Sequence, residues 1–378
     1  SSDWSSDVCS SDLNTSAGEL LQRHGDIISE VKFQENGLRE FPRQIRTGQS
    51  IARGSTILVL RSGGIGDHVM LLPALERWWQ EQLQGQGIKV WLAVQRSMFS
   101  IFAGSGCLAG TYALPLTLEQ FLRADYFLDF TSLVGLGDFS KRHPTECYLR
   151  ALGLDGGDEN RVSAMISSDG LCHTVGAKKI QEIKGGHEDR PLVLLQWRAS
   201  VHMRTLPPHK LSQLTNSFRQ FRFIVAHAKE YADETDREIE EAGINAVNVS
   251  SAMGDLRDFL GAISSVDAVV STDSSGYHVA AALGKPAVAI FGSIRSDLRT
   301  CYYPNVLSVG SLYRGQECIS PCGRHKGECP EARRLRCGYS PCLLEIPEEL
   351  ICRKFEGLIR KHYIGKEFGN LRIEEGYE

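Results

Sequence analysis

The stretch that decides the fold is ILVLRSGGIGD, residues 57–67. Its four apolar residues in a row, 57–60, predict a short strand buried on both faces, as strands of a parallel sheet are. The glycines that follow predict a tight turn, and the periodicity of residues 67–84 predicts a helix that begins at this turn. This order of strand, turn and helix is typical of the first unit of an α/β domain.

The same alternation continues along the chain and divides it into two halves. The first half has further predicted strands at 90–94 and 126–130 and a helix at 144–152. The second half has predicted strands at 192–195, 223–226, 246–249, 268–270 and 287–291, and predicted helices at 208–218, 233–242, 255–263 and 277–283. We therefore expect an α/β protein of two Rossmann-like parallel-sheet domains that face each other across a cleft, with ligands at the carboxyl ends of the strands.

The composition suggests where the domains begin and end. Residues 1–13 repeat Ser-Ser-Asp, which cannot build a core and predicts a disordered or non-native tail. The expected order is an N-terminal domain at 14–170, a linker at 171–190, a C-terminal domain at 191–350 and a final helix and tail at 351–378. The second domain contains a cysteine-rich segment, residues 318–342.

Charge and hydropathy exclude some classes of protein. The formal net charge is −4, so no general basic field favours nucleic acid. No apolar run reaches the roughly 18 residues of a membrane-spanning helix, and no basic stretch followed by an apolar one opens the chain. We expect a cytoplasmic protein.

The first glycine turn does not fit a dinucleotide site. Val69 stands where the third small residue of that motif belongs, and Gln95 ends the second strand in place of an acidic residue. Asp67 occupies the helix start, where it would repel a pyrophosphate. Its carboxylate is either a helix cap or a base for the hydroxyl of a bound molecule, which Gly64 and Gly66 would allow to approach closely.

A second turn predicts an anion site. Residues 269–286 read VVSTDSSGYHVAAALGKP, in which a strand enters a serine- and glycine-rich turn and a helix of small residues follows. Free N–H groups and hydroxyls at such a helix start bind phosphate, although an ordinary capped helix has the same sequence pattern. The loop after the strand at 192–195 adds arginines, whose forked guanidinium suits pyrophosphate.

These segments together resemble glycosyltransferase family 9, the ADP-heptose:lipopolysaccharide heptosyltransferases. The opening strand and Gly-Asp turn, followed by LPAL at 72–75, are similar to the start of that family. DSSGYH at 273–278 is similar to its donor-binding motif, and RTLP at 204–207 stands where the family has Lys-x-Trp-Pro. The similarity covers roughly residues 55–360.

The resemblance implies a GT-B fold and a metal-independent inverting transfer of heptose from ADP-heptose to a lipopolysaccharide-core or related hydroxyl. Asp67 would be the catalytic base, and Arg204 would stabilise the leaving diphosphate. Glu230, or else Glu234, would hold the ribose. The full set expected to bind the donor is Gly64, Gly66, Gln196, Arg198, Glu230, Asp273, Ser274, Ser275, Gly276 and His278. A glycolipid acceptor would bring the enzyme to the inner face of the membrane.

Two departures from the family pattern leave the donor open. Ser275 replaces a glycine, and Arg204 replaces a lysine. The alternatives are a nucleotide-sugar epimerase of the same fold, which needs no acceptor, and a non-catalytic protein that binds a sugar nucleotide or a metal.

Five cysteines within residues 318–342 form the last candidate site. Four thiolates can hold a structural zinc or iron ion in tetrahedral geometry, although this spacing matches no standard pair of Cys-x2-Cys motifs. Free thiols are the alternative. The candidate ligands are Cys318, Cys322, Cys329, Cys337 and Cys342.

Overall fold

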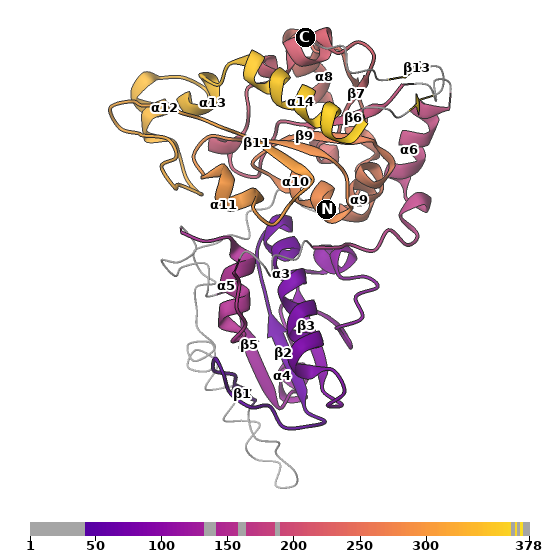
Figure 1. Ribbon diagram of the computed structural model, residues 1–378, viewed down its shortest axis with the longest axis vertical. Helices are drawn as coiled ribbons and strands as arrows, with labels where there is room; N and C mark the ends of the chain where they lie inside the picture. The colour runs from indigo at the N-terminus through magenta and orange to yellow at the C-terminus, as the bar shows by residue number, and fades with distance from the viewer. Residues whose placement is uncertain are drawn as a thin grey trace. The chain divides into compact units, whose positions relative to one another are not determined.

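A computed structural model describes residues 42–131, 141–157, 164–185, 190–363, 367–368 and 371–372. The tail predicted at 1–13 lies outside the described residues. The chain divides at residues 161 and 162 into two compact units, here called the N-terminal and the C-terminal unit. Each contains one parallel sheet (Figure 1).

The N-terminal unit has a five-stranded sheet in the order β1-β5-β2-β3-β4, with every pair parallel. The strands are β1 (Arg43–Gln44), β2 (Thr56–Leu60), β3 (Lys89–Val94), β4 (Gly110–Ala113) and β5 (Tyr126–Asp129). The helices are α3 (Ile65–Trp78), the π-helical η2 (Trp79–Leu83), the 3-10 helix η3 (Arg96–Ile101), α4 (Leu118–Leu122) and α5 (Pro144–Ala151).

Alternation along β2 separates the two faces of this sheet. Leu58 belongs to a small apolar cluster with Phe127 and Ala124, at the end of α4. Arg61 follows the strand on the opposite face and lies against Tyr148 of α5. Figure 1 shows α3 and α5 beside β2 and β5. Thus α3 and α5 cover one face, and the short α4 covers the other.

The C-terminal unit has a six-stranded parallel sheet in the order β11-β10-β9-β6-β7-β8. Its strands are β6 (Leu192–Gln196), β7 (Arg222–Val225), β8 (Val247–Asn248), β9 (Ala268–Thr272), β10 (Ala287–Phe291) and β11 (Val306–Gly310), with a separate antiparallel pair, β12 (Glu367–Phe368) and β13 (Leu371–Arg372). Its α-helices are α6 (Val175–Lys184), α7 (Ser212–Ser217), α8 (Ala232–Glu241), α9 (Leu256–Ser265), α10 (Ser275–Ala282), α11 (Ser296–Thr300), α12 (Pro330–Leu335), α13 (Pro341–Leu344) and α14 (Glu348–Tyr363). Short 3-10 helices are η7 (Leu171–His173), η8 (His202–Arg204), η9 (Pro208–Leu211), η10 (Lys229–Tyr231) and η11 (Ser250–Ala252).

Aromatic packing fixes the last long helix on the sheet of the C-terminal unit. Phe355 of α14 is fully buried and packs against Phe218, Phe221 and Phe223, with ring centroids 5.1 to 6.2 Å apart. Burial of one such side chain stabilises the fold by roughly 1.5–3 kcal/mol. The α14 helix therefore closes the core of this unit.

The predicted fold class is confirmed: the protein is α/β with two parallel sheets, and each predicted strand corresponds to an observed one. The single helix predicted at 67–84 is wrong in detail, because α3 ends at Trp78 and a π-helical turn follows. Five described strands were not predicted: β1, β4, β11, β12 and β13. Of these, β1, β4 and β11 lie at sheet edges, where exposed or half-buried residues give no continuous apolar run.

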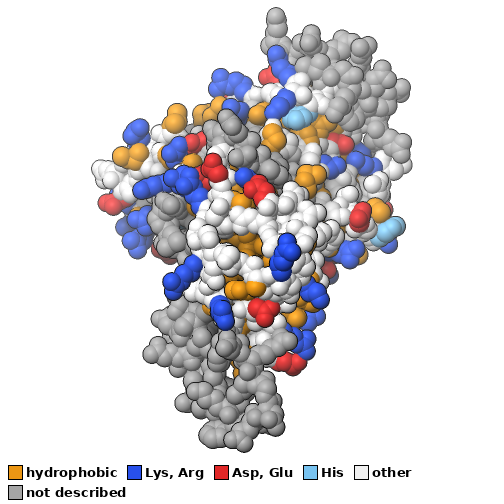
Figure 2. All heavy atoms as spheres, turned by 60° about the horizontal axis from the view of Figure 1, so that its bottom comes forward, with side chains coloured by type: hydrophobic (Ala, Val, Ile, Leu, Met, Phe, Trp, Pro, Cys, Tyr) orange, Lys and Arg blue, Asp and Glu red, His pale blue; other side chains and the backbone are white. Residues whose placement is uncertain are grey.

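No helix in the described part of the chain is long and apolar enough to cross a membrane. On the face shown in Figure 2, Lys and Arg side chains are interspersed with Asp and Glu.

Candidate functional site

Asp67 lies at the start of α3 and is held from two sides. Its Oδ1 is 2.9 Å from Nη2 of Arg61, and its Oδ2 accepts a 3.0 Å hydrogen bond from the N–H of Gly64. The Arg61 side chain is 2% exposed, whereas that of Asp67 is 33% exposed. A buried cation therefore fixes an anion that still reaches solvent, which suits a group that must accept a proton.

The turn before Asp67 requires glycine at position 63. Gly63 has φ of +136°, and a Cβ there would lie 2.8 Å from Oδ2 of Asp67. Gly64 leaves more room, since a Cβ would lie 3.7 Å from the same oxygen. The motif thus places the carboxylate through backbone geometry that other residues rarely adopt.

His68 supports the same turn from inside. Its Nδ1 lies 2.8 Å from the carbonyl oxygen of Gly64, and its Nε2 lies 3.3 Å from that of Arg61. Complete burial, together with the nearby Arg61 cation, lowers the pKa of His68 to about 4. His68 is therefore neutral at pH 7 and holds the turn without adding charge.

In the C-terminal unit, Gln196 at the end of β6 organises the start of α10. Its Oε1 accepts hydrogen bonds from Oγ of Ser274 and from the N–H of Gly276, both at 2.8 Å, and from Oγ of Ser271 at 3.2 Å. Its Nε2 lies 3.4 Å from Oγ of Ser275. The predicted donor residues 196 and 274–276 are thus brought together, and the Gln196 amide oxygen occupies the N–H of Gly276, the second residue of the helix.

Arg204 lies beside this turn. Its Nη1 donates to the carbonyl oxygen of Asp273 at 3.0 Å and lies 3.5 Å from the Asp273 carboxylate, while Nη2 donates to Oγ of Ser200 at 3.2 Å. The Arg204 backbone carbonyl accepts from Thr272 at 2.6 Å. A guanidinium fixed beside a helix N-terminus can stabilise a diphosphate that carries negative charge.

His278 is part of the turn's support. It is 6% exposed, its Nδ1 lies 2.8 Å from the hydroxyl of Tyr303, and its ring lies 4.0 Å from that of Tyr277. This bonding fixes the α10 helix against the segment after α11.

The contacts of Arg198 hold its guanidinium against η10 and α8 and not at the α10 turn. Its Nη2 lies 2.8 Å from Glu234 and 2.7 Å from Glu238, and its guanidinium lies over the ring of Tyr231 at 4.8 Å. Glu234, the alternative ribose ligand, is therefore engaged by a cation. Glu230, in η10 directly after β7, is exposed.

Several residues at these sites were not predicted from the sequence. Arg61 directly follows the first predicted strand and precedes the turn that ends in Asp67, and this position is the sequence signal that could have identified it. The others are Ser200, Ser271 and Tyr303, whose contacts join segments far apart in the chain.

The described cysteines are all free thiols. Four of those near the C-terminus, Cys318, Cys322, Cys329 and Cys342, are close enough for electrostatic interaction. Burial, together with the nearby Cys322 and Cys329, raises the pKa of Cys318 to about 12. Burial also raises the pKa of Cys342 to about 12, with Cys318, Cys329 and Cys322 nearby. Cys337 instead donates to the carbonyl oxygen of Tyr339 at 3.3 Å. Among the described residues, no group of three or more His, Cys, Asp or Glu side chains is placed so that it could hold a metal ion.

Comparison with known proteins gives one matching family model. Residues 167–324 match Glycosyltransferase family 9 (heptosyltransferase). This segment contains the β9–α10 turn and Arg204 and ends just beyond Cys322. No curated protein matches the chain at a significant level.

Solved structures extend the likeness of fold to both units. A glycosyltransferase family 9 protein from Veillonella parvula DSM 2008 is 12% identical with a TM-score of 0.60, over 83% of this chain and 99% of that one. The ADP-heptose LPS heptosyltransferase II of E. coli is 15% identical with a TM-score of 0.59, over 81% and 99%. The iron-containing dodecameric glycosyltransferase TibC of enterotoxigenic E. coli H10407 is 12% identical with a TM-score of 0.55, over 83% and 78%.

Proposed function

Because residues 167–324 match the model of glycosyltransferase family 9 (heptosyltransferase), we propose that this chain belongs to that family and is an inverting glycosyltransferase that uses a nucleoside diphosphate sugar. The observation that carries the proposal is the turn at the start of α10, where Gln196, Ser274 and Arg204 surround a helix N-terminus inside the family-matched segment. Backbone N–H groups, hydroxyls and a guanidinium together suit a diphosphate.

In this proposal Asp67 is the base. It takes the proton of the acceptor hydroxyl as that oxygen attacks the anomeric carbon, and the bond to the diphosphate breaks. Arg61 and the N–H of Gly64 hold the carboxylate in place. Charge that develops on the leaving diphosphate is stabilised by Arg204 and the α10 turn. No metal ion is needed for this chemistry.

We propose ADP-heptose as the donor and a lipopolysaccharide-core or related hydroxyl as the acceptor. Heptosyltransferase II of E. coli, which shares the fold, is named for ADP-heptose. Glu230 is exposed after β7 and is available to a ribose, whereas Glu234 is paired with Arg198. These observations support Glu230 as the ribose ligand.

The first test is thermal unfolding of the purified protein with ADP, UDP, GDP or CDP. A ligand that binds the folded state at 100 times its Kd stabilises it by about 2.7 kcal/mol, so a selective shift identifies the base. We expect ADP to give the largest shift. A UDP or GDP preference would refute the choice of donor, and no shift with any of them would refute the transferase proposal.

A second test separates transfer from epimerisation. Incubated with ADP-heptose alone, a transferase leaves the sugar configuration unchanged and requires an acceptor for rapid ADP release. An epimerase changes the sugar without any acceptor, which NMR of the nucleotide sugar would detect.

We also propose that four cysteines hold a structural metal ion. Cys322 and Cys329 lie near both Cys318 and Cys342, whose pKa values are raised, and four thiolates suit zinc or iron. The iron-containing TibC supports this proposal. Metal analysis of the purified protein should find about one equivalent, which Cys342→Ser should remove and Cys337→Ser should not. Metal-free wild-type protein would refute it.

A further inference from the structure

A pocket of about 370 Å³ lies on the face of the N-terminal sheet that α3 and α5 do not cover. It opens at the amino ends of the strands, beginning at Thr56, whereas Asp67 follows their carboxyl ends. The four residue steps along β2 alone separate these ends by about 13 Å. The pocket is therefore distinct from the place of the proposed base.

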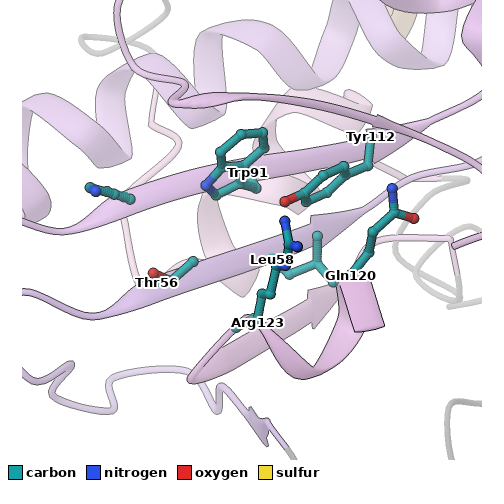
Figure 3. Close-up of a pocket in the computed structure, with 8 residues that line it drawn as sticks. Thr56, Leu58, Trp91, Tyr112, Gln120 and Arg123 are labelled. Carbon is teal, nitrogen blue, oxygen red and sulfur yellow. The ribbon is translucent and has the colours of Figure 1, made fainter. Parts of the chain in front are cut away.

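Two stacked aromatic rings form one wall of the pocket. The rings of Trp91 and Tyr112 lie 4.6 Å apart with an interplanar angle of 14°, above Leu58 in Figure 3. Gly110 pairs directly with Trp91, and a Cβ at that position would lie 2.5 Å from the indole. The glycine thus allows the indole to lie flat across β4 and reach Tyr112.

Polar groups from three segments complete the lining. Thr56 comes from β2, Lys89 from β3, and Gln120 and Arg123 from α4 and its end (Figure 3). Threonine and glutamine both donate and accept hydrogen bonds, while the two cations only donate. These polar groups match the hydroxyl groups of a ligand, because a hydroxyl also donates and accepts hydrogen bonds.

The charges around the pocket are balanced. Arg123 pairs with Glu119, and the carboxylate of Asp125 accepts a 2.7 Å hydrogen bond from the N–H of Thr56. Two cations in the lining are therefore matched by two carboxylates at its edge, so the site has no net charge that would attract an anion.

We propose that this pocket is a non-catalytic binding site for a neutral saccharide unit. A pyranose ring presents an apolar face of C–H groups, which packs on an aromatic wall, and a rim of hydroxyls, which meets the polar groups. The volume lies within the range of small-ligand sites. The inference does not depend on the proposed transfer reaction.

The test is ligand-detected NMR with four probes: methyl α-D-glucoside, a glucose-containing oligosaccharide, glucose 6-phosphate and AMP. All are measured with saturating ADP, which occupies the donor site. We expect saturable binding of the glucoside. If the oligosaccharide binds more tightly than the glucoside, the natural ligand is part of a glycan. If the two bind equally, the natural ligand is a free sugar. Tighter binding of AMP or of the phosphate would overturn the neutral-saccharide assignment.

Variants locate the binding. Trp91→Ala should weaken glucoside binding at least about tenfold, which corresponds to 1.4 kcal/mol. Lys89→Ala changes an exposed side chain and should weaken binding without affecting the fold. Trp79→Ala is the matched control, since Trp79 lies in η2 outside the pocket, and it should bind as wild type. Unchanged binding in both Trp91→Ala and Lys89→Ala, or no binding by the wild type, would overturn the proposal.

Discussion

Asp67→Asn is the sharpest test of the proposed chemistry, because it changes one charge and almost no volume. The amide oxygen can still accept from the N–H of Gly64, so the turn can keep its shape. What is lost is the ability to take a proton. General-base assistance contributes about 10²–10⁴-fold, and we expect kcat to fall by that factor.

The same change has a predictable effect on stability. Breaking a fully buried ion pair costs roughly 3–5 kcal/mol, but Asp67 is one-third exposed and Asp129 also acts on Arg61. We therefore expect a smaller loss, about 1–2 kcal/mol, and a Tm lower by a few degrees. Urea unfolding measures this loss, so turnover can be compared at a temperature where both proteins are folded.

Three measurements would refute this reasoning or separate its parts. Wild-type kcat in Asp67→Asn would remove Asp67 as the base. If Asp67→Asn abolished the thermal shift given by ADP, Asp67 would act on the donor instead. Glu119→Gln is the control: it neutralises a carboxylate that is 76% exposed in the same unit, and it should keep full turnover.

Three further predictions concern the turn and the buried histidine. Gly276→Ala places a Cβ 2.4 Å from Oε1 of Gln196, so the thermal shift given by ADP should shrink. An unchanged shift would contradict the proposed role of the α10 turn in donor binding. Arg204→Gln should lower kcat by about 10²-fold, as loss of one electrostatic donor does, in steady-state assays; wild-type kcat would exclude that role. The free energy of unfolding should fall as pH drops from about 6.5 to about 4, because the lowered pKa of His68 makes the folded state resist protonation. Urea titrations should show a total of about 3 kcal/mol from this group, and a His68→Asn variant with the same slope would contradict the assignment.

The buried strands could be predicted from the sequence because burial on both faces leaves a continuous apolar run. In β6 all five residues are buried, and its prediction was correct to within one residue. The edge strand β4 could not be predicted in this way, since its four residues are all half-buried. Propensity also gave no sign that the helix after residue 65 changes to π geometry at Trp79.

At the candidate sites, the sequence motifs identified candidate site residues but not the side chains that pair with them. The sequence indicated Arg198 as a phosphate ligand, yet Glu234 and Glu238, about 40 positions along the chain, pair with it. Such a pairing depends on how α8 packs against the segment that follows β6, and no local sequence pattern predicts this. The converse holds for Gln196 and Ser274, which the family resemblance assigned to one donor site and which the adjacent parallel strands β6 and β9 bring together.

The contact between Gln196 and Gly276 has a consequence for how this protein can vary. The amide fills the space that any side chain at 276 would need, so the two positions are constrained as a pair. A shorter residue at 196 would make room for alanine at 276, and the double substitution should be less damaging than the sum of the two single ones. Libraries that randomise either position alone would therefore miss the sequences that this turn can accept.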